Sequence, residues 1–226
     1  MLAQLERLPA PWRRALAVSG PDDLPIAPDS ALARAAHERV EELSAPWLHA
    51  HCMRTWAFSA LLARTGGVAH DPELLYLACV LHDLGLAAPH DRDPAIGCFA
   101  VEGARAAHAF VCDHGGSGDR ALVVAEAITL HLNVTVPARL GAEASLLSRG
   151  VSLDVVGRHA DRLPAAGVAR VEQRWPRDGL AGELIATTVA QARARPQSRS
   201  ALLHRLGFAR LVRANPLDRD RLAAAA

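Results

Sequence analysis

Apolar positions along the chain show neither the period-two alternation of half-buried strands nor an internal repeat. They fall in longer stretches that Gly and Pro interrupt. Ala, Leu, Val and Arg dominate and aromatic residues make up only 4% of the chain, which favours helix over strand. The sequence therefore predicts an all-α fold. The predicted helices cover about residues 31–43, 46–64, 72–85, 97–114, 119–131, 137–148, 152–160, 164–174, 179–194 and 199–206.

Cap and turn residues set the ends of the first three predicted helices. Asp29-Ser30 suits the N-cap of the first, and Pro46 suits the first turn of the second, which Gly66-Gly67 ends. Asp71-Pro72-Glu73 opens the third helix, which is predicted to end at Gly85.

The length of 226 residues suits one domain with helical extensions. Residues 1–28 are rich in proline and predict an irregular lead-in. Residues 29–215 predict the helical domain with a C-terminal helical extension, and residues 216–226 predict a fraying tail.

Charge and hydropathy narrow the class of protein. The formal net charge is only +1, so no global field attracts nucleic acid or an anionic membrane. All basic residues are Arg, which excludes Schiff-base and P-loop lysine chemistry. No signal peptide is evident, and the longest apolar run, Leu74 to Leu81, is too short to span a bilayer. We therefore expect a cytoplasmic protein with no membrane or nucleic-acid partner.

The first candidate for chemistry is His82-Asp83, which ends that apolar run. A helix so apolar is expected to be buried, and an imidazole and a carboxylate at its inner end need a partner that offsets their desolvation. A metal ion is one such partner, since both groups are ligands for a borderline cation. The alternative is a core histidine with satisfied hydrogen bonds beside an aspartate that caps a neighbouring helix.

His51 continues an apolar face of the predicted helix 46–64, which Thr55, Phe58 and Leu62 share. Arg54 lies three residues on, near the same face, where a guanidinium suits an anionic or polar substrate group. Taken singly, His51 could equally pack in the core and Arg54 could form a surface ion pair.

Asp154 lies between Leu153 and Val155, as either a helix N-cap or a buried ligand. The order is then His51, His82-Asp83 about 30 residues later and Asp154 about 70 residues beyond. Two imidazoles and two carboxylates suffice for a mononuclear metal site with open positions for water. Such a cation lowers the pKa of bound water.

With these residues, the chain resembles the HD-domain superfamily of metal-dependent hydrolases, whose signature is H…HD…D. It is most similar to the branch that contains the cyanamide hydratases. The matching stretches are His51 to Trp56, Glu73 to Leu86, Phe99 to Ala104, Gly150 to Gly157 and Trp175-Pro176-Arg177. The resemblance implies an all-helical HD-domain bundle in which His51, His82, Asp83 and Asp154 bind one divalent metal ion.

Two departures from the superfamily pattern narrow the activity. Many dinuclear HD phosphodiesterases carry a histidine where this chain has Phe99, so one metal ion is expected rather than two. HD-type 5′-nucleotidases carry a glutamate where this chain has Leu86, which weakens a nucleotidase assignment.

Two further residues match positions of the superfamily. His131 is expected near the pocket as a proton shuttle, a substrate contact or a support for a ligand, or else on the surface at a helix end. Glu102 matches an acid of this branch and would either support the site or be solvated.

The resemblance implies a hydrolase or hydratase that adds metal-activated water to a small polar substrate, as the cyanamide hydratases do. Asp83 would also accept a proton, and Arg54 and His131 would orient the substrate. The alternatives are hydrolysis of phosphomonoesters or phosphodiesters and a non-catalytic HD module that binds a metal or a ligand. Imidazole and carboxylate ligands suit Zn, Fe, Mn or Co. The sequence leaves homo-oligomerisation open.

Overall fold

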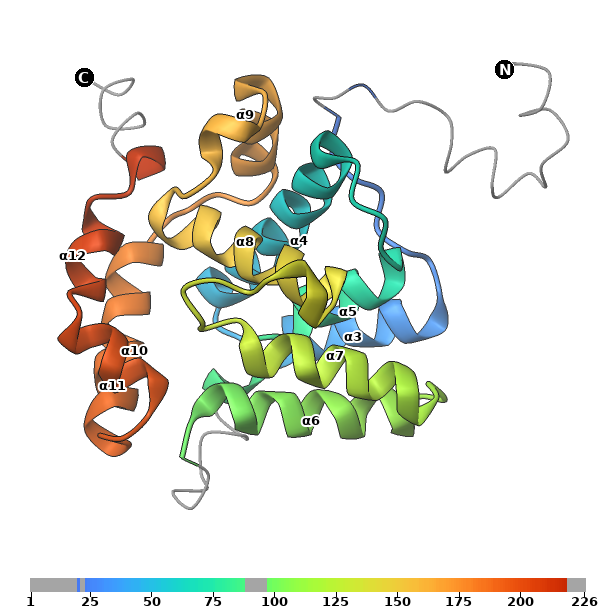
Figure 1. The fold of residues 1–226 in the computed structure, drawn as a ribbon, viewed down its shortest axis with the longest axis horizontal. Coiled ribbons are helices and arrows are strands. Elements are labelled where there is room, and N and C mark those ends of the chain that lie inside the picture. Colours follow the sequence, from blue (N-terminus) through green and yellow to red (C-terminus); the bar gives the residue numbers. More distant parts are fainter. Residues whose placement is uncertain (1–19, 21–22, 88–96, 219–226) are drawn as a thin grey trace, which may run out of the picture.

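A computed structural model describes residues 20, 23–87 and 97–218 of the chain (Figure 1). These residues form α-helices and short 3-10 turns without strands, so the predicted all-α class is confirmed. Most of the predicted lead-in and part of the predicted tail lie outside the described residues. The helices are α3 (Ala31–Leu43), α4 (Pro46–Gly66), α5 (Pro72–Leu81), α6 (Phe99–Asp113), α7 (Gly118–Leu130), α8 (Ala142–Val156), α9 (Ala165–Arg174), α10 (Leu180–Ala194), α11 (Arg199–Arg205) and α12 (Phe208–Arg213), with 3-10 turns η1 (Leu84–Leu86), η2 (Ala138–Leu140) and η3 (Ala160–Arg162).

The caps of the first helices agree with the predictions. The Ser30 hydroxyl accepts a hydrogen bond from the backbone N–H of Ala33 at the start of α3. The Asp71 carboxylate accepts from two backbone N–H groups at the start of α5. Gly67, with φ of 61°, ends α4 in the left-handed conformation.

Helices α4, α5 and α8 meet in the core, and α6 and α7 form an antiparallel pair beside them (Figure 1). All residues of α5 from Leu74 to Leu81 are buried, so this helix passes through the middle of the domain. Its last turn therefore delivers His82 and Asp83 to the interior, as the apolar run predicts.

Two glycines that were expected to end helices serve close packing. The predicted break between the helices 137–148 and 152–160 is wrong, because α8 continues through Gly150. A Cβ atom there would lie 2.1 Å from the Ser59 hydroxyl and 2.6 Å from the Thr55 carbonyl, so Gly150 allows α8 to touch α4. The third predicted helix ends at Leu81 rather than at Gly85, where a Cβ atom would lie 1.9 Å from the Phe99 carbonyl.

Helices α10, α11 and α12 form a unit along one side of the bundle (Figure 1). Leu180, Leu184 and Val212 of this unit pack with Val155 of α8 in a second, smaller apolar cluster. The sequence prediction missed α12. Among the described residues, no helix combines the length and the apolar character that a membrane crossing requires.

Candidate metal centre

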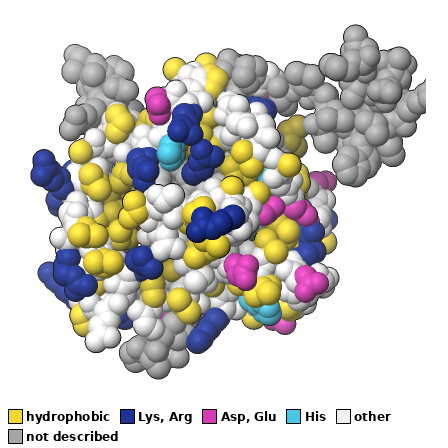
Figure 2. All heavy atoms as spheres, viewed as in Figure 1, with side chains coloured by type: hydrophobic (Ala, Val, Ile, Leu, Met, Phe, Trp, Pro, Cys, Tyr) yellow, Lys and Arg dark blue, Asp and Glu magenta, His cyan; other side chains and the backbone are white. Residues whose placement is uncertain are grey.

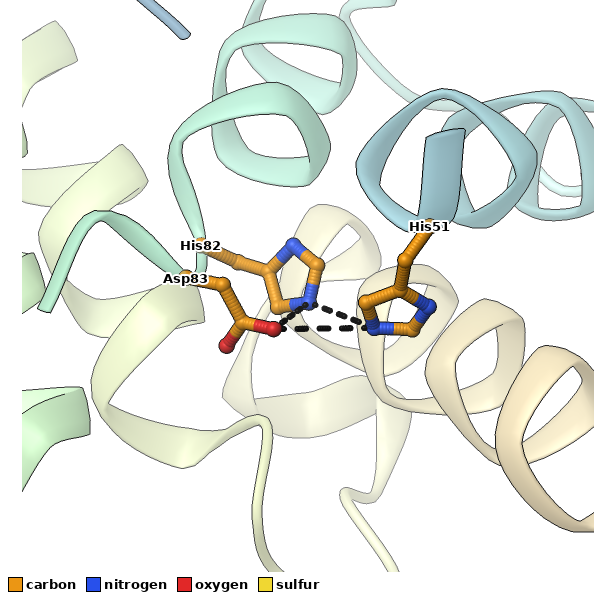
Figure 3. Close-up of side chains that lie close together, drawn as sticks. All are labelled: His51, His82 and Asp83. Carbon is orange, nitrogen blue, oxygen red and sulfur yellow. Dashed lines mark hydrogen bonds and ion pairs between the residues drawn. The ribbon is translucent and has the colours of Figure 1, made fainter. Parts of the chain in front are cut away.

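Three side chains converge in the buried core, from two helices that are distant in sequence. His51 comes from the N-terminal third of α4, and His82 and Asp83 follow the last residue of α5 (Figure 3). One ligand atom of each lies within 4.8 Å of the others. The Nε2 atoms of the two histidines are 3.3 Å apart, and Oδ2 of Asp83 lies 3.3 Å from Nε2 of His82 and 3.6 Å from Nε2 of His51.

These separations match the edges of a metal coordination shell. A tetrahedral zinc ion with bonds of 2.0–2.2 Å to imidazole and carboxylate places its ligand atoms about 3.4 Å apart. The ligand atoms of His51, His82 and Asp83 therefore have the spacing that would let them hold one such ion. Three protein ligands with one open position are typical of a catalytic rather than a structural site.

The opposite nitrogen of each imidazole is tied to an acceptor. Nδ1 of His51 donates to Oδ2 of Asp154 at 2.6 Å, and Nδ1 of His82 donates to the Cys79 carbonyl at 2.7 Å. An Nδ1–H that donates outward leaves the Nε2 lone pair free to point inward. Both rings thus present to the centre the atom that binds metal ions.

The charges of this group also suit a cation. Burial alone would raise the pKa of Asp83, but the adjacent His82, together with His131 and His51, holds that pKa well below its usual range. Burial would lower the pKa of His82, yet the Asp83 carboxylate outweighs it and raises that pKa. The buried Asp83 carboxylate therefore keeps its negative charge beside the imidazoles, as a cation site requires.

His131 follows α7 and borders the centre on its other side. Its Nε2 lies 3.6 Å from Oδ1 of Asp83, while its Nδ1 donates to the Ile128 carbonyl at 2.6 Å. Burial, and then the charge of His82, lowers the pKa of His131 to about 4, so the ring is neutral at pH 7. The surface position that the sequence left open for His131 is wrong, because its side chain is buried.

Phe99 lies at the start of α6 and packs its ring against His131, with ring centroids 5.9 Å apart. The position where dinuclear relatives have a histidine is thus occupied by a phenyl group beside the centre. A phenyl group offers no lone pair to a second metal ion.

Asp154 is fully buried in the last turn of α8, but the structure does not place it with the other three residues. Its Oδ2 accepts from Nδ1 of His51, at the edge of the ring opposite Nε2. Its predicted role as a direct ligand stays a prediction. The alternative as an N-cap is wrong, because residue 154 lies at the C-terminal end of its helix.

Two buried arginines neutralise Asp154. Nε of Arg54 donates to Oδ1 at 2.8 Å, and Nη1 of Arg177 donates to the same oxygen at 2.5 Å. Burial would raise the pKa of Asp154, but these two guanidinium groups hold it well below its usual range. Nη1 of Arg54 also donates to the carbonyls of Trp175 and Pro176, so this guanidinium is directed at protein groups.

Arg177 is not among the site residues that the sequence predicts. The stretch Trp175-Pro176-Arg177 matches the family branch, and this match is the sequence feature that could have identified Arg177. Arg177 also pairs with Asp218, and the Asn215 amide donates to the Asp154 carbonyl at 2.9 Å. Nothing in the sequence around Asn215 or Asp218 points to the centre, because these contacts span many residues.

Glu102 lies on α6 and is buried, so it is not the solvated acid that the sequence allowed as one alternative. Its carboxylate pairs with Arg195 at 3.2 Å, and Arg195 also bonds to Gln191. Glu102 therefore ties α6 to the C-terminal end of α10.

A cavity of about 140 Å³ is lined in part by His131. Val155 of α8 and Phe208 and Leu211 of α12 contribute apolar walls, and Asn133 contributes an amide. The C-terminal unit therefore supplies walls of a cavity that His131 also lines.

A helical bundle that gathers two imidazoles and a carboxylate in its core has the ligand groups of a metal-dependent enzyme. The model of the HD domain family matches residues 48–161, half of the chain, and the chain belongs to this family. It is an enzyme of the hydrolase or hydratase type.

Two relatives in Saccharomyces cerevisiae are similar over much of their length. The cyanamide hydratases DDI2 and DDI3 are each 29% identical to this chain over 153 residues. The aligned segment covers 66% of this chain and 68% of each relative. The resemblance to the cyanamide hydratase branch is thereby confirmed.

Proposed function

We propose that this enzyme binds one divalent metal ion through His51, His82 and Asp83 and hydrates a small substrate with a carbon–nitrogen triple bond. The observation that carries the metal is the triangle of ligand atoms at 3.3, 3.3 and 3.6 Å, with both imidazoles held so that Nε2 points inward. Two imidazoles and one carboxylate suit Zn, Fe, Mn or Co.

One metal ion is proposed rather than two, because Phe99 fills the place beside His131 where a second ion would need a ligand. Asp154 is proposed to support the ion through His51, since an anion at Nδ1 fixes the ring and makes Nε2 a better donor. Direct ligation by Asp154 would require its Oδ2 to leave Nδ1.

A bound divalent ion supplies an acidified water molecule near neutral pH. The protein groups around it divide the remaining work. Oδ2 of Asp83 faces the two ligating imidazoles, whereas Oδ1 faces His131. Hydration joins the oxygen of one water molecule to the nitrile carbon and moves both of its protons to the nitrile nitrogen, which gives an amide. His131, neutral at pH 7, is positioned beside Asp83 to carry a proton in this transfer.

Arg54 is proposed to position Asp154 rather than to contact the substrate. Its guanidinium is fully buried and donates to both oxygens of Asp154 and to two backbone carbonyls. This differs from the role in orienting the substrate that the sequence predicts for Arg54.

The substrate is proposed to be small. The cavity that His131 lines in part holds about 140 Å³, below the range of about 300–1,000 Å³ for pockets that bind drug-sized ligands. The two yeast relatives are named cyanamide hydratases, and cyanamide has three heavy atoms. Cyanamide or a simple nitrile is therefore the first substrate to test.

A panel assay tests the proposal. The enzyme, loaded in turn with zinc, iron, manganese and cobalt, is assayed for hydration of cyanamide and simple nitriles and for hydrolysis of nucleotides and a generic phosphodiester. Turnover of cyanamide or a nitrile that His82→Ala abolishes is the expected result. If the enzyme hydrolyses only phosphoesters and hydrates neither cyanamide nor a nitrile, the proposal is wrong and the phosphohydrolase alternative holds.

A further inference from the structure

A second hollow, of about 350 Å³, lies between residues 134–138, α8 and the turn that follows α8. Hydroxyl groups and basic groups line it, and no acidic side chain is among its lining residues. The hydroxyl groups belong to Thr135, Ser145, Ser148 and Ser152, and the basic groups to Arg149, Arg158, His159 and Arg162. Such a set is unusual in a chain with nearly equal numbers of basic and acidic residues.

The local fold gathers these basic side chains from both ends of a chain reversal. Gly157, with φ of 72°, ends α8, and His159 follows with φ of 69°. His159 is the one residue other than glycine with positive φ in the described part of the chain. The reversal brings Arg158 and Arg162 back toward Arg149 of α8. A hydrogen bond of 3.0 Å from Arg158 to the Val134 carbonyl holds one of them across the hollow.

The arginines of this hollow differ from other arginines of the protein in their ion pairs. Arg54, Arg120 and Arg177 each form buried or partly buried ion pairs. Within the described residues, none of the salt bridges involves Arg149, Arg158 or Arg162. Figure 2 shows several basic side chains around one histidine on this face of the molecule, with an acidic side chain nearby.

The pKa of His159 reports the same convergence. Burial lowers it first, and the charges of Arg158, Arg149 and Arg162 lower it further. Asp161 alone acts in the opposite direction. Three cations around one imidazole repel one another at a cost that an anionic ligand would remove.

We propose that this hollow binds a phosphate group, either free or carried by a small molecule. Guanidinium groups present paired donors that match phosphate oxygens, and the neighbouring hydroxyls add further donors. The hollow shares Val134, Ser152 and Arg158 with the 140 Å³ cavity. A phosphate held there therefore lies beside the cavity that His131 lines.

Calorimetric titration of the metal-loaded enzyme with inorganic phosphate, at constant ionic strength, tests the proposal. Saturable binding is expected in the natural protein. Arg149→Ala/Arg162→Ala should weaken it about tenfold or more, because it removes two charge-assisted donors. The matched control is Arg193→Ala/Arg213→Ala, which removes two exposed arginines of the C-terminal unit and should leave affinity unchanged.

Two results would overturn the site. Equal weakening in both double variants would assign phosphate binding to diffuse surface charge. Binding that survives Arg149→Ala/Arg162→Ala but disappears in His82→Ala would place the phosphate at the metal centre. The readout does not need turnover, so it stands whether or not cyanamide is a substrate.

The same probe distinguishes the two sources of phosphate once a substrate is in hand. Phosphate that raises KM without changing kcat, in the natural protein but not in Arg149→Ala/Arg162→Ala, assigns the hollow to part of the substrate. Phosphate that changes kcat under the same comparison assigns it to an effector.

Discussion

Asp154 is the buried carboxylate that pairs with two buried arginines and with one histidine of the metal centre. Its two oxygens accept hydrogen bonds from His51, Arg54 and Arg177, and all four side chains are at most 1% exposed. A carboxylate so enclosed is expected to be important for both folding and metal affinity, since its loss leaves two buried cations without an anion.

Asp154→Asn keeps the shape of the side chain and removes its charge. We expect the free energy of unfolding to fall by about 3–5 kcal/mol, the usual effect of breaking a buried ion pair. Metal affinity should fall about 10–100-fold, as it does when a group that holds a ligating histidine is lost. Urea unfolding and metal titration measure the two effects, with the exposed Asp161→Asn as control. An unchanged unfolding free energy would contradict the placement of Asp154.

His131→Asn separates proton transfer from metal binding. The variant should lower kcat about 10²-fold or more, because a neutral imidazole next to Asp83 is lost as a proton carrier. Metal content should stay the same, since His51, His82 and Asp83 are unaltered. The exposed His114→Asn is the control, and an unchanged kcat in His131→Asn would assign the residue to packing alone.

At the scale of elements, the centre depends on how closely α4 and α8 approach. His51 lies on α4 and Asp154 on α8, and Gly150 is the residue that lets their backbones meet. The hydrogen bond of 2.6 Å from His51 to Asp154 joins the two helices, and Asp154 lies one turn of α8 beyond this glycine.

Gly150→Ala is expected to destabilise the protein by about 1–3 kcal/mol, because its Cβ would overlap the Ser59 hydroxyl and the Thr55 carbonyl. Metal affinity should weaken with it. Gly182→Ala is the matched control, since that helical glycine has open space around it and alanine there should stabilise by about 0.5–1 kcal/mol. Equal behaviour of the two variants in thermal unfolding would contradict close packing at Gly150.

The same elements show what the sequence could predict. The caps at Ser30 and Asp71 and the burial of Leu74 to Leu81 are local properties, and they were predicted correctly. The role of Gly150 was not, because a glycine that ends a helix and a glycine that lets two helices touch look alike until the partner helix is placed. For the same reason, the motif predicted His51, His82, Asp83 and Asp154 all as ligands. In the structure the first three converge, whereas Asp154 bonds to Nδ1 of His51.

On the scale of the whole molecule, residues beyond the matched HD segment complete the centre. Arg177 and Asn215 lie after residue 161, and both bond to Asp154. The C-terminal unit also supplies Phe208 and Leu211 to the cavity at His131. The C-terminal extension thus bonds to Asp154 of the HD segment and shares a cavity with it.

Asn215→Ala tests that dependence without truncating the chain. It removes the hydrogen bond that the side-chain amide donates to the backbone carbonyl of Asp154. It also removes the hydrogen bond that the side-chain oxygen of Asn215 accepts from the backbone N–H of Leu217. We expect a loss of about 1–3 kcal/mol in unfolding free energy, because buried groups lose their partners. Metal release should also become faster. The exposed Gln173→Ala is the control, and an unchanged rate of metal release would separate the extension from the centre.

The most direct test of the account is the metal content of the purified enzyme and of its His82→Ala variant, measured by elemental analysis. We predict one divalent ion per chain in the natural protein and none in the variant, with both proteins folded by circular dichroism. Metal-free natural protein that cannot be loaded, or an ion that stays bound in His82→Ala, would contradict it.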